Sequence, residues 1–131
     1  MTFHPEHFTV WTEIPSADLD RAVPFYEAVL QTKLEREDGG PNVLYMFKTA
    51  NHPMGISGHL YPGKPAKDGA GPTIHLAAPD KLEDTMDRVR DAGGMIVSDP
   101  IAMPFGRFAY ALDLDGNSIG LFEPASDFTA G

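Results

Sequence analysis

Three side chains in this sequence, Glu13, His59 and His75, are of types that bind metal ions or transfer protons, and each lies in a strand-like segment. Two imidazoles and a carboxylate could supply three ligands of a metal site, or they could be polar groups that line a ligand cavity. Glu13 could also act as a general base beside His75, or it could simply accept hydrogen bonds from its surroundings. In both cases we favour the non-catalytic interpretation.

Two further side chains suit ligand binding. Trp11 could stack on a planar ligand or pack in the core, and the sequence does not choose between these. The guanidinium of Arg107 could hold an anionic ligand group with paired hydrogen bonds, although a solvent-facing strand residue is the simpler interpretation. The acidic segment 113–117 lacks the spacing and the glutamate of a calcium loop, so we predict a hairpin turn.

The first half of the chain predicts a strand over residues 8–14 and then a helix with one apolar stripe. Pro24 falls inside this stripe, so the helix either starts near Asp20 or bends at the proline. Residues 43–48 and 55–61 read as two more strands. A Gly- and Pro-rich connector follows over residues 62–72.

The second half repeats this order. Residues 73–77 predict a strand, and Asp80 and Glu83 have the spacing of a capping box before a helix that stops at Gly93 and Gly94. Strands follow over 95–98, 105–113 and 118–123. We therefore expect an α+β fold, one domain over 1–131, with βαβββ modules at about 8–61 and 73–124. The third strand of the first module is faint.

Strand alternation assigns the faces of the predicted sheets. Val10 and Ile14 should meet the helix of the first module, and Ile74 and Leu76 that of the second. The residues of opposite parity should then share one concave, ligand-binding face: Trp11, Glu13, Ser57, His59, Tyr61, His75, Gly120 and Phe122. Aromatic surface with a few convergent polar groups is typical of a small-molecule pocket.

The composition narrows the class of partner. The net charge is −9 and no Lys/Arg cluster offsets it, so we expect neither a nucleic acid nor an anionic membrane as partner. The chain has no cysteine, which excludes disulfides and thiolate chemistry. The first residues do not resemble a secretory signal, and no apolar run is long enough to cross a membrane. A cytoplasmic location is the resulting expectation.

Four motifs in order resemble the vicinal-oxygen-chelate superfamily, which has the glyoxalase/bleomycin-resistance fold. They are the segments Glu13–Pro15 and Asp18–Tyr26, the Ala92–Gly94 stop, and the closing hairpin over 104–121. The resemblance covers nearly the whole chain. It implies an open curved sheet with helices on its outer side, a site on the concave side, and a homodimer.

The resemblance also bears on metal use. Metal-binding members take ligands from positions that correspond here to Trp11, His59, His75 and Gly120, of which only the two histidines can bind a metal. We therefore expect no metal and no other cofactor, and a protein that binds a small molecule, as the bleomycin-binding members do. The alternative is a glyoxalase-like lyase or isomerase, or a dioxygenase, that uses Glu13, His59 and His75.

Overall fold

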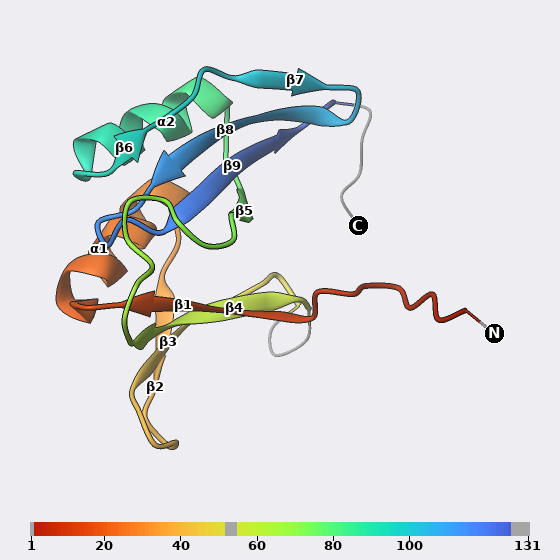
Figure 1. Ribbon diagram of the computed structural model, residues 1–131. Helices are drawn as coiled ribbons and strands as arrows, with labels where there is room; N and C mark the ends of the chain where they lie inside the picture. The colour runs from red at the N-terminus through yellow and green to blue at the C-terminus, as the bar shows by residue number, and fades with distance from the viewer. Residues whose placement is uncertain (1, 52–54, 127–131) are drawn as a thin grey trace.

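A computed structural model of the protein describes residues 2–51 and 55–126. Within these residues, two helices and nine strands follow one another (Figure 1). The first half has the order βαβββ, and the second half has the same order with one additional strand. The elements of the first half are β1 (Trp11–Ser16), α1 (Leu19–Leu30), β2 (Leu34–Glu37), β3 (Leu44–Phe47) and β4 (Ser57–Pro62). Those of the second half are β5 (Ile74–Ala77), α2 (Leu82–Asp91), β6 (Met95–Ile96), β7 (Ile101–Met103), β8 (Gly106–Leu112) and β9 (Ser118–Pro124).

The strands form two sheets of mixed direction. The first has the order β1-β4-β3-β2, and the second has the order β5-β9-β8-β6 with β7 also pairing with β8. In each sheet the first strand runs parallel to the last strand of its half, β1 beside β4 and β5 beside β9, and the remaining pairs are antiparallel. The predicted α+β class is confirmed. Neither helix in the described parts of the chain has the length and apolar character that a membrane crossing needs.

Helices α1 and α2 pack on each other and cover one face of the sheets (Figure 1). Their apolar stripes meet the inward residues of both sheets in one continuous core, which includes Ile14, Phe25, Tyr26, Val29, Leu60, Leu82, Met86, Val89, Ala109, Ala111, Ile119 and Leu121. Burying such side chains contributes roughly 1.5 to 3 kcal/mol each before the entropy cost of ordering the chain. This shared core makes the two halves one structural unit.

The structure decides where α1 begins. Asp18 is the N-cap, and its Oδ1 accepts a hydrogen bond from the N–H of Asp20 at 3.1 Å. The helix continues through Pro24 without a break. Because Pro24 is exposed, the carbonyl group that loses its donor can face water.

The first strand is shorter than predicted. It begins at Trp11, and Phe8 and Val10 are 75% and 66% exposed, so the expectation that Val10 meets the helix is wrong. The pairing of β1 with β4 starts at Trp11 and Ser57, so the preceding residues have no ladder partner there. Figure 1 shows this N-terminal segment running away from the body of the protein. The side-chain alternation of residues 8–10 therefore predicted strand residues that have no neighbouring strand to pair with.

The sequence also missed β2 and mispredicted the start of α2. The β2 sequence Leu-Glu-Arg-Glu lacks apolar alternation, and the strand exists because it pairs with β3. The capping box from Asp80 to Glu83 does not form. Instead, Glu123 of β9 accepts the N–H of Leu82 at 2.7 Å, while Glu83 pairs with Arg107. A carboxylate distant in sequence thus satisfies the helix terminus.

A buried carboxylate joins the two halves. Asp113 accepts hydrogen bonds from the hydroxyl of Tyr26 at 2.5 Å, from Asn117 Nδ2 at 2.9 Å, and from the backbone N–H groups of Asp115 and Asn117 at 2.9 Å each. Asn117 Nδ2 also donates to the carbonyl of Pro15 at 2.9 Å. The predicted hairpin turn is confirmed, and its side chains also hold α1 and β1 of the first half.

The contact between Tyr26 and Asp113 is our first test. The variant Tyr26→Phe keeps the ring but leaves a buried carboxylate short of one donor, so the free energy of unfolding should fall by about 1 to 3 kcal/mol in urea denaturation. Tyr45→Phe is the control, because Tyr45 packs on the same core and its hydroxyl forms no hydrogen bond within the described residues. An equal loss in the two variants would contradict the role of the hydroxyl.

The same pair predicts a response to alkaline pH. Burial, and then the nearby charge of Asp113, raise the pKa of Tyr26 well above its ordinary value of 10. Because the folded state favours the protonated phenol, this contribution is complete below pH 10 and is lost as the pH rises further. The wild-type stability should therefore fall more steeply above pH 10 than that of Tyr26→Phe.

Candidate functional site

A cleft lies between the outer edges of β1 and β5. Each of these strands has one ladder partner in the described residues, β4 for β1 and β9 for β5, so their other edges are unpaired. The cleft between them has a volume of about 990 Å³. Its lining combines apolar residues of the two edges with polar ones: His7, Thr9, Trp11, Thr12, Glu13, Ile14, Leu30, Thr32, Phe47, Lys48, Thr49, Ile56, Ser57, Gly58, Pro72, Thr73, Ile74, His75, Leu76 and Ala77.

Four of the predicted site residues line this cleft, namely Trp11, Glu13, Ser57 and His75. The others do not. His59 and Tyr61 lie beside each other behind the β1 wall, Gly120 and Phe122 lie on β9, and Arg107 lies on β8. The sequence missed the apolar wall residues, such as Ile14 and Leu76, because their alternation assigned them wholly to the core. The gap between the two strand edges leaves Leu76 half-buried at the cleft, whereas Ile14 is 1% exposed and lines the cleft from the core.

The wall along β1 contains a connected group of three side chains. The register pairs Glu13 with His59 on the neighbouring strand, and Trp11 lies two residues before Glu13 on the same face. The indole Nε1 of Trp11 donates a hydrogen bond to His59 Nδ1 at 2.9 Å. His59 Nε2 lies 3.2 Å from Glu13 Oε1 but without the alignment of a hydrogen bond. Parity and register together therefore produce a Trp–His–Glu cluster at the cleft.

His75 occupies the space that Gly120 leaves. The two residues are direct partners in the β5–β9 ladder, and a Cβ at Gly120 would overlap the imidazole of His75. The ring also contacts Phe108 and Tyr110, with centroid distances of 5.2 and 5.8 Å. The missing side chain at Gly120 therefore accommodates the His75 ring.

Arg107 does not join this group. It shares the parity of Ala109 and Ala111, which face the helix, and lies opposite to Phe108 and Tyr110, which contact His75. Its guanidinium forms two bonds to Glu83 at 2.8 Å and one to Glu123 at 2.7 Å. These bonds lower the pKa of Glu83 from 4.5 to about 2 and raise that of Arg107. The paired hydrogen bonds with which Arg107 could have held an anionic ligand group are thus formed with the protein's own carboxylates.

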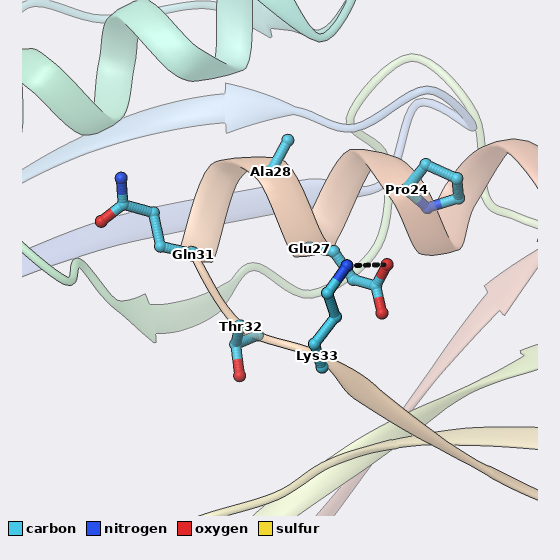
Figure 2. A pocket seen from close by; sticks show the side chains of 6 residues that line it. All are labelled: Pro24, Glu27, Ala28, Gln31, Thr32 and Lys33. Carbon is cyan, nitrogen blue, oxygen red and sulfur yellow. Dashed lines mark ion pairs between the residues drawn. The ribbon is translucent and has the colours of Figure 1, made fainter.

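A second hollow, of about 670 Å³, lies on the outer side of the C-terminal part of α1 (Figure 2). Its lining comes from one helix and the turn that follows, and includes Pro24 and Gln31. Its two charged groups, Glu27 and Lys33, pair with each other at 3.8 Å, and Glu27 also accepts the N–H of Leu34. None of the predicted site residues lies there, so the cleft is the better candidate.

The residues at the metal-ligand positions that the resemblance implies do not fit a catalytic metal. Trp11 can only donate a hydrogen bond, Gly120 has no side chain, and the Nδ1 lone pair of His59 is used by the indole. Within residues 2–51 and 55–126, no three His, Asp or Glu side chains are grouped so that they could hold a metal ion. We therefore derive no chemistry through a metal.

Sequence comparison supplies the family. The family model for the glyoxalase/bleomycin resistance protein/dioxygenase superfamily matches residues 6–121, and the chain belongs to this superfamily. The predicted resemblance is confirmed. Comparison with functionally curated proteins gives no match.

Solved structures support the same fold. Hypothetical protein SA1046 of S. aureus is 19% identical, with a TM-score of 0.66, over 90% of this chain and 98% of its own. A glyoxalase/bleomycin resistance protein from Albidiferax ferrireducens T118 is 21% identical, with a TM-score of 0.63, over 86% and 95%. The glyoxalase I of Leishmania major is 21% identical, with a TM-score of 0.67, over 90% and 87%. At these identities the similarity shows the fold alone.

The packing of His75 on Gly120 gives a prediction for this site. The variant Gly120→Ala should displace the imidazole ring, which NMR would detect as a shift of the His75 ring resonances. The exposed ring can swing outward, so we expect a stability loss of only about 1 kcal/mol. Gly40→Ala is the control, since a Cβ at Gly40 meets no atom within 4 Å. Unchanged His75 resonances in Gly120→Ala would contradict the packing.

Proposed function

We propose that the protein binds a small organic molecule in the cleft between β1 and β5, without a catalytic metal. The observation that carries this proposal is the cleft itself. Its volume of about 990 Å³ lies near the upper end of the usual range for small-molecule sites. It offers apolar walls from Ile14, Ile74 and Leu76 together with polar groups from Glu13 and His75, a combination that holds and orients a ligand.

Catalysis by Glu13, His59 and His75 is the alternative function, and the geometry gives it less support. His59 is 7% exposed and lies behind the cleft wall, so a substrate in the cleft does not reach its ring. The ring of His75 packs against Gly120, Phe108 and Tyr110 on its own sheet. Each imidazole thus contacts residues of its own sheet, and the two rings do not point toward one reacting atom.

A fluorescent neutral probe, N-phenyl-1-naphthylamine, tests the proposed function. We expect binding in the micromolar range, with quenching of the chain's single tryptophan, Trp11, by energy transfer. Ile56 lines the cleft and is 44% exposed, so Ile56→Arg should weaken binding about tenfold or more by placing a charge in an apolar wall.

Val97→Arg is the matched control, because Val97 is similarly exposed at 50% but lies outside the cleft lining. It should bind the probe as the wild type does. Absence of probe binding, or equal weakening in the two variants, would refute a binding site in the cleft.

We also propose that the protein is a homodimer. The exposed apolar side chains of the N-terminal segment, Phe3 and Phe8, form a surface that a second copy can cover. Light scattering at micromolar concentration should give twice the mass of one chain. The mass of a single chain would refute the dimer.

A further inference from the structure

The cluster of Trp11, His59 and Glu13 places a carboxylate next to an exposed aromatic face inside the cleft. The side chain of Glu13 is 66% exposed and Trp11 is 41% exposed, whereas His59, which contacts both, is 7% exposed. The buried imidazole therefore fixes the indole of Trp11 by a hydrogen bond and lies 3.2 Å from the carboxylate of Glu13, while both neighbours line the cleft. Such a built arrangement on adjacent strands is more rigid than isolated surface groups.

The hydrogen bonds fix the state of His59. An indole N–H can only donate, so His59 Nδ1 must present its lone pair to Trp11. The ring in this arrangement is neutral and carries its proton on Nε2, which faces Glu13 Oε1 and has no aligned hydrogen-bond partner in the described residues. His59 thus lies beside the carboxylate without a positive charge that would cancel its negative one.

No other group neutralises Glu13. In the part of the chain that the structure describes, no lysine or arginine lies within salt-bridge distance of its carboxylate. Among the described residues of the lining, Lys48 is the only lysine and pairs with Glu35 at 3.2 Å, and the other basic groups are His7 and His75. Glu13 is the only acidic residue of this described lining. The described part of the cleft therefore has one carboxylate without a lysine or arginine partner, two residues after Trp11 on the same strand.

We infer that the ligand carries a compact organic cation, such as an ammonium or amidinium group attached to an apolar body. The Glu13 carboxylate is its counter-ion, the face of Trp11 provides a cation–π contact, and the apolar wall of Ile74 and Leu76 takes the remainder. Anions are repelled by the same carboxylate. The inference rests on the proposed binding function and specifies the chemical class of its ligand.

Three small probes of one ring type test the inference by NMR: benzylammonium, benzyl alcohol and benzoate. The chain has one tryptophan, so a single indole N–H signal reports on Trp11 directly. Benzylammonium should shift this signal with about tenfold higher affinity than benzyl alcohol, and benzoate should bind more weakly still. The preference should shrink in high salt, because it is electrostatic.

Glu13→Gln keeps the shape of the side chain and removes its charge. The preference for benzylammonium over benzyl alcohol should therefore shrink severalfold, to the part that the cation–π contact with Trp11 supplies. Glu37→Gln is the matched control, since Glu37 is exposed on β2 and outside the cleft lining. It should retain the full preference. His59→Phe should weaken the preference and also shift the indole signal in the free protein, because the hydrogen bond from Trp11 is lost.

Equal binding of all three probes to the wild type would overturn the inference while leaving a binding cleft intact. An undiminished preference in Glu13→Gln would overturn it too, because the counter-ion would then be another group. If N-phenyl-1-naphthylamine also failed to bind, the proposed function would fall together with the inference.

Discussion

The buried carboxylate of Asp113 is the interaction on which the arrangement of the two halves depends. A carboxylate that is nearly inaccessible to water needs donors, and Tyr26 of α1 and Asn117 of the β8–β9 turn supply them. Asn117 also reaches the carbonyl of Pro15 at the end of β1. The first half is thus fixed to the second at this point. Further along, no ladder joins β1 to β5, and the cleft lies there.

The two halves share the parallel pairing of their first and last strands but place different side chains on it. In the first, the ring of His59 on β4 reaches back to Trp11 and Glu13 on β1. In the second, Gly120 on β9 has no side chain, and the ring of His75 on β5 lies over it. Each imidazole is engaged within its own sheet. The two histidines therefore do not point toward a common metal position. This arrangement favours ligand binding by the residues that line the cleft over catalysis at a metal ion.

Much of the fold could be predicted because it follows from local patterns. The apolar stripes of both helices, the glycine stop of α2 and the turn before β9 all appear in the structure. The failures share one cause. The N-terminal part of strand one, the capping box and the free guanidinium of Arg107 each needed knowledge of a partner distant in sequence. Glu123 illustrates this, since it both caps α2 and binds Arg107.

The sequence by itself determined which residues share a face, because alternation along a strand and periodicity along a helix depend only on local backbone geometry. It therefore placed Trp11 with Glu13, and His75 opposite the core. Only the tertiary structure decided which of these faces opens onto solvent, and which side chains find partners. The gap between β1 and β5, the bond from Trp11 to His59 and the pairing of Arg107 all arise between segments dozens of residues apart. The geometry of these contacts depends on how whole helices and strands pack together, and a local sequence pattern contains no information about that packing.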